Sequence, residues 1–388
     1  MKKKIIILGS TGSIGKNLIN ILKKDKAKID ILLLTANKNY SELLKQVKIF
    51  RVKNIIINDY KSYLQVKKSL KGKKIKIYNN FNLINKILRN IKADYTMNAL
   101  VGLDGLYPTL KIIKNTKKIA IANKESIICG WNLIKNELKK NKTDFIPIDS
   151  EHFSIWSLMD QTKNENIEKI FITASGGPFS KYPLKRFKLI TPKLALNHPN
   201  WKMGKKISID SATMMNKVFE IIEAKKIFKI EYKKLEILVH PKSYVHAIVK
   251  FTNGLIKILV HDTNMKIPIF NSVYPNFQKK IKTNPLNLYN LNNSNFEYIN
   301  KKRYPIVNVL ANLPNNDSLF ETIIVTANDK LVNLFLNKKI HFNDISKLLL
   351  KFLSQKEFIK YKKIKPKNID QIKNLSKYVS LKIDTLSV

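Results

Sequence analysis

The chain has very little cysteine and no long apolar run, and each shortage narrows its class. Cys129 is the only cysteine among 388 residues, which excludes a disulfide framework and any metal site built from several thiolates. The apolar run at residues 5–8 is too short for the core of a secretory signal. No stretch approaches the roughly 18 apolar residues of a membrane span. We therefore expect a cytoplasmic protein with no membrane partner.

Arginine is also scarce, although the net charge is +44. Such a charge is typical of nucleic-acid-binding proteins. However, only four of the 72 basic residues are arginine, the side chain that reads phosphate and guanine with two donors. The lysines are spread along the whole chain, which favours a general surface composition over a nucleic-acid partner. We expect the charge to attract anionic substrates from a distance.

Residues 1–149 alternate short β-branched runs with amphipathic stretches. The expected strands are residues 5–8, 29–34, 54–57, 75–77, 95–97 and 119–122, with a further strand-like run at 145–148. Helical patterns lie between them, for example at 17–24 and 40–49. Strands that alternate with helices indicate right-handed crossovers and a doubly wound parallel sheet.

After residue 149 the pattern changes to a central α+β domain, expected over 150–282. Expected strands are 169–173, 235–239, 244–251 and 254–260, with helices at 192–196 and 212–227. We expect these strands to be antiparallel. A linker rich in asparagine, 283–304, leads to a helical domain, 305–388, with helices at 319–336, 344–353 and 369–376. The predicted class is α/β with a C-terminal helical domain.

A glycine-rich loop, Gly9-Ser-Thr-Gly-Ser-Ile-Gly15, follows the first expected strand and opens the first helix. Glycines let the backbone turn sharply and approach a pyrophosphate, which rests on the helix N-terminal amides. Its spacing is GxxGxxG, so the strand-loop-helix context carries the prediction of a Rossmann-like dinucleotide site. A tight turn without a ligand is the alternative.

The end of the second strand indicates which nicotinamide cofactor binds. An acidic residue roughly 20 positions beyond the loop would hold the free 2′-hydroxyl of NAD. Here the chain reads Asn37-Lys38-Asn39, with no acid. Lys38 and Asn39 suit a 2′-phosphate, so NADPH is favoured.

Three carboxylates indicate a metal site. Asp149 and Glu151 follow the strand-like run, and Glu220 lies in a segment rich in hydroxyl, amide and amine groups, 211–220. Carboxylate oxygens are hard donors. Three of them without thiolates suit Mg²⁺ or Mn²⁺, with Co²⁺ as a further candidate, rather than zinc.

Several segments carry groups suited to a phosphorylated substrate. Ser175 lies in a glycine turn after a strand, where its hydroxyl can hold an oxyanion. Asp210 and Ser211 are interpreted as the start of a helix, a natural phosphate site. In that helix Asn216, Lys217 and Glu220 share one face, which is more than a solvated helix needs.

Two interpretations are less specific. Residues 122–126, Ala-Asn-Lys-Glu-Ser, follow a strand at the carboxyl edge where ligands bind, but they could equally begin a solvated helix. The loop 197–205 brackets Trp201 with Pro199 and Gly204, and we expect it to be mobile and to close over a ligand. An ordinary surface loop is the alternative. The roles of His152, His240 and His246, acid–base or structural, stay open.

In this order, the motifs strongly resemble the 1-deoxy-D-xylulose 5-phosphate reductoisomerase family. The likeness rests on residues 9–15, 122–126, 149–152, 175–178, 198–204 and 208–220. It implies an enzyme that converts 1-deoxy-D-xylulose 5-phosphate to 2-C-methyl-D-erythritol 4-phosphate, by rearrangement and NADPH-dependent reduction. That reaction belongs to non-mevalonate isoprenoid precursor biosynthesis. The resemblance also implies a homodimer.

The resemblance implies a role for each matching residue. The metal ligands would be Asp149, Glu151 and Glu220. Contacts with the sugar phosphate would come from Lys124, Ser150, Glu151, Ser175, His198, Trp201, Ser211, Asn216, Lys217 and Glu220. Contacts with NADPH would come from Thr11, Gly12, Ser13, Ile14, Asn37, Lys38, Asn39, Asn123, Glu125 and Gly204.

Three positions depart from the family pattern: Asn37 and Ala174 stand for glycines, and Asp329 for a glutamate. None is a metal ligand, so we expect activity to be retained. Two rival functions are a dehydrogenase that uses NADP without rearrangement and a non-catalytic nucleic-acid-binding protein. The structure of the product distinguishes a simple dehydrogenase from a reductoisomerase. Steeply salt-dependent DNA binding would support the nucleic-acid-binding function.

Overall fold

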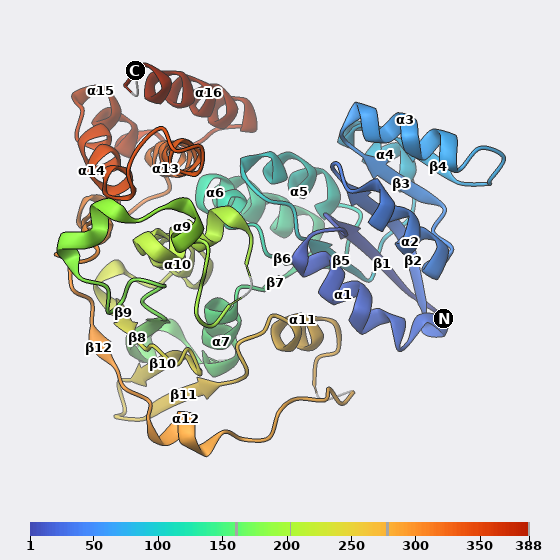
Figure 1. Ribbon diagram of the computed structural model, residues 1–388. Coiled ribbons are helices and arrows are strands. Elements are labelled where there is room, and N and C mark those ends of the chain that lie inside the picture. Colours follow the sequence, from blue (N-terminus) through green and yellow to red (C-terminus); the bar gives the residue numbers. More distant parts are fainter. Residues whose placement is uncertain (160–161, 202, 277–278, 387–388) are drawn as a thin grey trace. The chain divides into compact units, whose positions relative to one another are not determined.

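The computed structural model describes residues 1–159, 162–201, 203–276 and 279–386 (Figure 1). Two compact units account for these residues. The first unit contains Met1–Ser126, Leu133–Asp149 and Met265–Lys282. The second unit contains Ile127–Asn132, Ser150–Asn264 and Thr283–Val388.

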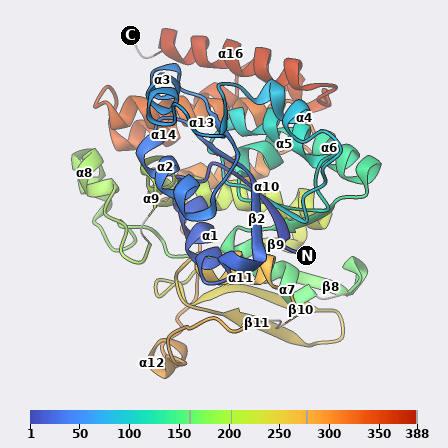
Figure 2. The ribbon, with the colours of Figure 1, turned by 90° about the vertical axis from the view of Figure 1, so that its right-hand side faces the viewer.

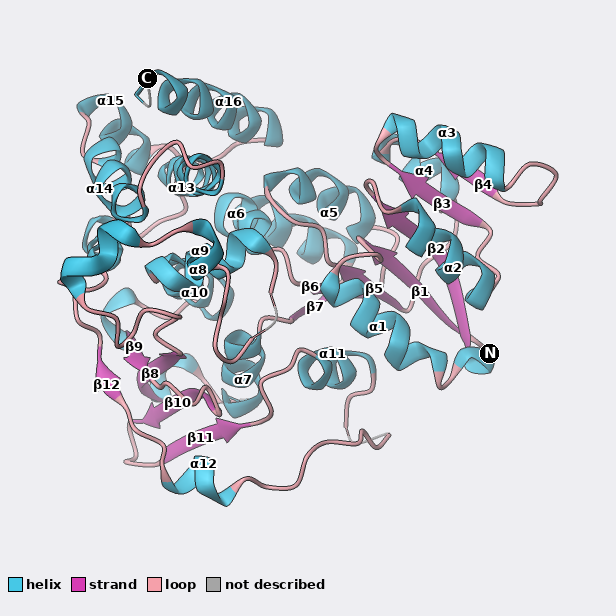
Figure 3. Cartoon of the chain, viewed as in Figure 1, coloured by secondary structure: helices cyan, strands magenta, loops and turns pink. Residues whose placement is uncertain are grey.

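A seven-stranded parallel sheet forms the centre of the first unit (Figure 3). Its strands are β1 (Lys3–Leu8), β2 (Ile29–Ala36), β3 (Asn54–Ile57), β4 (Lys76–Tyr78), β5 (Tyr95–Asn98), β6 (Lys118–Ile121) and β7 (Asp144–Pro147). The strand order is β4-β3-β2-β1-β5-β6-β7, so the winding reverses at β1. A reversal of this kind opens a crevice at the carboxyl ends of the central strands. The predicted doubly wound sheet is confirmed.

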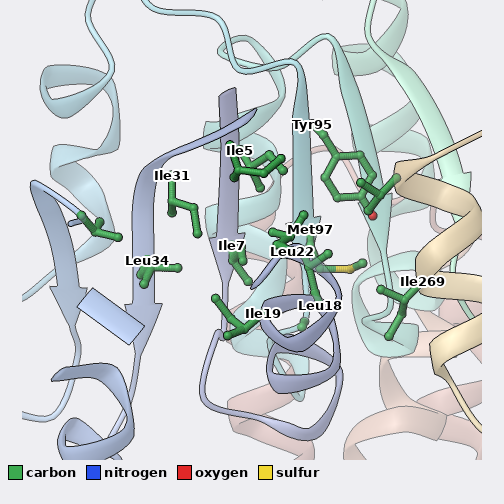
Figure 4. Packing of buried hydrophobic residues seen from close by; sticks show 14 of the residues in the cluster. Ile5, Ile7, Leu18, Ile19, Leu22, Ile31, Leu34, Tyr95, Met97 and Ile269 are labelled. Carbon is green, nitrogen blue, oxygen red and sulfur yellow. The ribbon is translucent and has the colours of Figure 1, made fainter. Parts of the chain in front are cut away.

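Helices cover this sheet because the chain crosses from each strand to the next. They are α1 (Ser13–Lys23), α2 (Tyr40–Phe50), α3 (Tyr60–Ser69), α4 (Ile84–Ile87), α5 (Leu106–Ile113) and α6 (Lys124–Asn141). This unit also contains α11 (Lys266–Val273), which is not one of these connections. The β-branched strands give the core Ile5 and Ile7, which pack with Leu18 and Leu22 of α1 (Figure 4).

The helix α11 comes from late in the chain yet belongs to the first unit. It packs on α1, and Ile269 is fully buried in the same core (Figure 4). A hydrogen bond of 2.7 Å joins the hydroxyl groups of Tyr95 and Ser272. Residues 265–276 and 279–282, which the sequence assigns to the central domain, therefore belong to the first unit, and several of them lie in its core.

The second unit contains a five-stranded mixed sheet. Its strands are β8 (Ile167–Ala174), β9 (Leu235–Val239), β10 (Val245–Phe251), β11 (Ile256–Val260) and β12 (Glu297–Tyr298), in the order β11-β10-β8-β9-β12. The prediction of an antiparallel sheet is wrong for one pair, because β8 and β9 run parallel. The long segment between them includes several helices, and a parallel pair needs a long crossover of this kind.

The helices of the second unit are α7 (Ser150–Met159), α8 (Pro192–Ala195), α9 (Lys205–Thr213), α10 (Met215–Phe228), α12 (Leu288–Asn292), α13 (Phe320–Leu336), α14 (Phe342–Leu353), α15 (Lys356–Ile359) and α16 (Ile369–Leu386). The helix α13 packs against both α14 and α16, as predicted for a helical C-terminal region (Figure 2). The predicted linker 283–304 contains α12 and β12. Within the described ranges, no helix is long and apolar enough to cross a membrane.

The predicted single helix at 212–227 is two helices. Met214 adopts a left-handed conformation with φ of 75°, which ends α9 and starts α10. Asp210 and Ser211 consequently lie near the end of α9, and the prediction that they start a helix is wrong. The local sequence contains no glycine or proline there, so the break is a product of tertiary packing around the buried Met214.

The glycine loop gives a test of the fold. A Cβ atom at Gly15 would lie 2.4 Å from the Gly9 carbonyl oxygen and 2.6 Å from the Cα of Ser10. At Gly12 the nearest atom would be 3.5 Å away and φ is −75°. We expect Gly15→Ala to lower the free energy of unfolding by about 1–3 kcal/mol, as overpacking does. Gly12→Ala is the control, with a much smaller loss. Urea unfolding measures both, and equal stability of the two variants would contradict the packing argument.

Candidate active site

The N-terminus of α1 is open to an anionic ligand. Its N-cap residue, Gly12, has no side chain that could accept a hydrogen bond from the backbone amides of the first turn. These amides can therefore donate to a bound anion. Gly9 has φ of 79°, and a Cβ there would lie 2.6 Å from the Ala99 carbonyl oxygen. The loop residues Thr11 and Ile14 are half-buried, whereas Gly12 and Ser13 are exposed. This loop can therefore bring its backbone close to a pyrophosphate.

Asn37, Lys38 and Asn39 follow β2 and are all exposed. The Asn39 side chain caps α2 by accepting a hydrogen bond of 3.2 Å from the Glu42 amide. Asn37 does not have positive φ, so the replacement of a glycine introduces no backbone strain.

Asn123 has a structural role that the sequence does not reveal. Its side chain accepts from the Ser126 amide at 2.6 Å and donates to the carbonyl oxygens of Leu100 and Gly102 at 2.8 and 2.9 Å. Only 1% of Asn123 is exposed, and Glu125 is also buried. The Asn123 amide therefore fixes the loop after β5. Beside it on α6, Lys124 forms an ion pair with Asp149, and both side chains are mostly buried.

A lysine lies between two acids in the second unit. The Lys217 ammonium forms ion pairs with Glu151 on α7 and with Glu220 on α10. The Asn216 amide donates to Glu220 at 2.5 Å, and the Ser150 hydroxyl donates to Glu151. The prediction that Asn216, Lys217 and Glu220 share one helical face is confirmed.

The three predicted metal ligands come together. Carboxylate oxygens of Asp149, Glu151 and Glu220 lie within 4.8 Å of one another. Asp149 and Glu151 are separated in the chain only by Ser150. Three hard oxygen donors without a thiolate fit Mg²⁺ or Mn²⁺.

His152 holds the two acid-bearing helices together. Its Nε2 donates to the Glu220 carbonyl oxygen at 2.9 Å, and its Nδ1 lies 3.8 Å from the Glu223 carboxylate. The ring is fully buried. Of the two roles left open by the sequence, the structural one describes this histidine.

The Ser175 hydroxyl is prepared to donate to a ligand. His198 Nδ1 accepts from the backbone amides of Asn200 and Trp201 at 3.1 and 3.0 Å, so the ring proton is on Nε2. Nε2 lies 3.0 Å from Ser175 Oγ and donates to it, and the Gly177 amide donates to the same oxygen at 3.0 Å. Both lone pairs of Oγ are then used, which leaves the hydroxyl proton for an external acceptor.

Ser211 is adjacent to this turn, although it does not start a helix. Gly177 has φ of 65°, and a Cβ there would lie 3.0 Å from the Ser211 carbonyl oxygen and the Ala212 Cα. The turn after β8 thus packs directly on the last turn of α9. Ser211 is half-buried. Two hydroxyl-bearing segments that are far apart in sequence meet at one place in the second unit.

The loop after α8 is held by the Asn200 side chain as well as by the hydrogen bond between His198 and Ser175. Asn200, which the sequence analysis missed, donates from Nδ2 to the Pro241 carbonyl oxygen at 2.6 Å and to Ser243 Oγ at 2.9 Å. Trp201 is half-buried, and Gly204 is exposed as the N-cap of α9. Lys202, within the predicted mobile loop, lies outside the described residues. No local signal predicts the Asn200 contacts, because the partners lie 41 and 43 positions away.

The two units together define a class of protein. The first has the reversing parallel sheet and open glycine loop of a dinucleotide-binding domain, and the second carries hydroxyl and amine groups beside acids suited to a metal. This is the class of metal-assisted, dinucleotide-dependent enzymes. Comparison with known proteins then gives the family.

Three family models match the chain. They are described as 1-deoxy-D-xylulose 5-phosphate reductoisomerase over residues 5–130, its C-terminal domain over 145–228, and the DXP reductoisomerase C-terminal domain over 261–380. The reductoisomerase of Pelagibacter ubique is 64% identical over 387 residues, covering 100% of both chains. That of Persephonella marina is 37% identical and covers 92% of each. This chain belongs to the 1-deoxy-D-xylulose 5-phosphate reductoisomerase family.

Solved structures agree. A reductoisomerase from Zymomonas mobilis in complex with NADPH has a TM-score of 0.88 and 30% identity, covering 100% of this chain and 99% of that one. A DOX-P reductoisomerase in complex with NADPH, fosmidomycin and magnesium has a TM-score of 0.90 and 29% identity, covering 99% and 98%. The α/β class with a C-terminal helical region is confirmed.

The pKa of His198 provides a test of this site. Burial, and secondarily the Lys217 ammonium, lower this pKa from 6.5 to about 4. Between these two values the unfolded chain binds more protons than the folded one, so this group removes stability as the pH falls from about 6.5 to about 4. We expect the His198 ring signals in NMR, assigned with His198→Gln, to stay constant from about pH 8 to 5. A midpoint near 6.5 would contradict the neutral, Nε2-protonated ring.

Proposed function

We propose that this protein converts 1-deoxy-D-xylulose 5-phosphate to 2-C-methyl-D-erythritol 4-phosphate, in an NADPH-dependent and divalent-metal-dependent reaction of isoprenoid precursor biosynthesis. The observation that carries the proposal is the convergence of Asp149, Glu151 and Glu220 with Lys217 between two of them. Family membership supplies the substrate. We propose the predicted division into an NADPH domain, 1–149, and a catalytic domain, 150–282, with the helix α11 packed in the former.

Asp149, Glu151 and Glu220 would hold the metal. When bound, the metal would polarise the substrate carbonyl, and NADPH would supply hydride. NADPH would lie on the glycine loop, with Lys38 and Asn39 at its 2′-phosphate. Glu125 and Gly204 are proposed as further contacts, and Asn123 would contribute through its backbone, since its side chain is engaged.

The Ser175 turn and the end of α9 would bind the substrate phosphate. The Ser175 hydroxyl has only its proton left to offer, which suits an anionic acceptor. Ser211 lies in the last turn of α9, and Asn216 and Lys217 lie in the first turn of α10. The Lys217 ammonium adds positive charge. Binding the remote phosphate orients the reacting end of the sugar. Neutral His198 would hold Ser175 in place and donate no proton of its own to the phosphate.

Lys124 and Ser150 would contact the reacting end, since each already bonds a proposed metal ligand. Trp201 would cover the substrate and exclude water. The Asn200 side chain bonds the segment 241–243, and we propose that the loop 197–205 closes over bound substrate. The single buried Cys129 is consistent with the cytoplasmic location that we also propose.

The metal assignment is tested by one assay: oxidation of NADPH with 1-deoxy-D-xylulose 5-phosphate, with Mg²⁺ or Mn²⁺ and after chelation. We expect chelation to abolish turnover. Glu220→Gln and Asp149→Asn should each lower kcat by at least about a hundredfold, because each removes a charge that holds the metal. Glu165→Gln, at an exposed acid paired with surface Lys163, is the control. Full activity in excess chelator would refute the assignment.

We also propose a homodimer that uses the edge strand β11. Ile256 and Ile258 point to one face of β11 and are 58% and 52% exposed, next to exposed Leu255. An apolar edge strand is rarely left open to solvent. A second copy of the chain would cover it, as the family resemblance implies.

Light scattering tests this assembly. We expect the wild type to have the mass of a dimer and Ile258→Glu to be monomeric, because a buried unpaired charge opposes association. Leu381→Glu, at an equally exposed leucine on α16, is the control and should stay dimeric. A monomeric wild type, or a dimeric Ile258→Glu variant, would exclude this interface.

A further inference from the structure

The strand β10 has a bulge at His246. In its pairing with β11, Val245 is opposite Val260 and Ala247 is opposite Leu259, so His246 is the extra residue. A bulge re-aims the side chain of the extra residue, and bulges are over-represented beside active sites. The bulge is thus a local feature that directs the His246 ring.

The His246 ring lies flat on a second histidine. The His246 and His261 ring centroids are 3.7 Å apart, with an angle of 16° between the planes. His246 Nε2 donates to the His261 carbonyl oxygen at 3.0 Å, and His261 Nδ1 donates to the Asp262 carbonyl oxygen at 2.8 Å. Both rings are buried, so the stack has a fixed orientation.

His261 contributes mainly its flat face. Its Nε2 is a buried atom with no hydrogen-bond partner, an arrangement that costs free energy. Burial lowers the pKa of this ring, which is therefore neutral at pH 7. Only one of its two ring nitrogens, Nδ1, makes a hydrogen bond.

The stack supports Trp201. The indole ring meets His246 edge to face, with centroids 6.1 Å apart and an angle of 75°. The Trp201 backbone amide donates to His198, which in turn donates to Ser175. A continuous series of contacts thus runs from His261 through His246, Trp201 and His198 to the hydroxyl that would bind phosphate.

We propose that His261 is a positioning residue, whose ring face fixes His246 and, through it, places the Trp201 indole over the substrate site. This inference rests on the proposed function. His261 itself would touch neither substrate nor cofactor. In this proposal, His261 positions His246 through the flat face of its ring and not through its nitrogen atoms.

Three variants distinguish stacking by the flat ring of His261 from the effects of its nitrogen atoms and of its volume. His261→Phe keeps a flat ring and removes the unpartnered nitrogen, His261→Leu keeps apolar volume without a flat ring, and His261→Ala removes both. Fluorine NMR of protein labelled with 5-fluorotryptophan reports on Trp131, Trp156 and Trp201, the three tryptophans, and Trp201→Phe assigns the relevant signal.

We expect the Trp201 signal to shift and broaden in His261→Leu and His261→Ala, with the other two signals unchanged. KM for 1-deoxy-D-xylulose 5-phosphate should rise about tenfold with kcat within about twofold, because a group that holds substrate and transition state equally affects KM alone. His261→Phe should resemble the wild type in both measurements. If His261→Ala does not fold, as circular dichroism would show, His261→Leu carries the test.

Two results would overturn the proposal. One is an unshifted Trp201 signal with wild-type KM in His261→Leu. The other is a His261→Phe variant as impaired as His261→Leu, which would assign the role to the nitrogen atoms. A wild type that does not turn over this substrate would refute the proposed function instead, while the fluorine spectra would still decide whether His261 positions Trp201.

Discussion

Mutual repulsion between buried carboxylates is the constraint on which the second unit depends. Glu151 and Glu220 lie close together with little access to water, so their negative charges repel each other. The Lys217 ammonium offsets this repulsion, and a divalent cation would do so more strongly. Because ions out of water cost several kcal/mol each unless well paired, the separation of α7 and α10 has to be fixed. The buried His152 fixes it through the backbone of Glu220.

The polar groups around the site follow a common logic. Asn123 uses both of its amide hydrogens and its carbonyl oxygen within the protein, His198 uses both ring nitrogens, and Ser175 uses both lone pairs. Each group is therefore rigid, and Ser175 has one remaining direction in which to bond. Preorganised donors of this kind need little rearrangement when a ligand binds.

The parts of this structure that the sequence predicts are those set by local pattern. The strands of the first unit are short β-branched runs, and their ends are predicted to within two residues for β1, β2 and β3. The metal ligands are recognisable because Asp149 and Glu151 are close in sequence. Distant packing decides the rest: the break at Met214, the parallel pairing of β8 with β9, and the place of α11 have no local signal. The bulge at His246 belongs to the same group, since only the partner strand defines it.

The break between α9 and α10 also bears on how the family can change during evolution. Ser211 lies near the end of one helix, and Asn216, Lys217 and Glu220 lie in the first two turns of the next. A deletion of one residue between them would rotate every later side chain on α10 by about 100°. The segment 205–228 can therefore accept substitutions but not changes in length. Insertions are better tolerated in the asparagine-rich stretch 283–298, most of which lies on the surface.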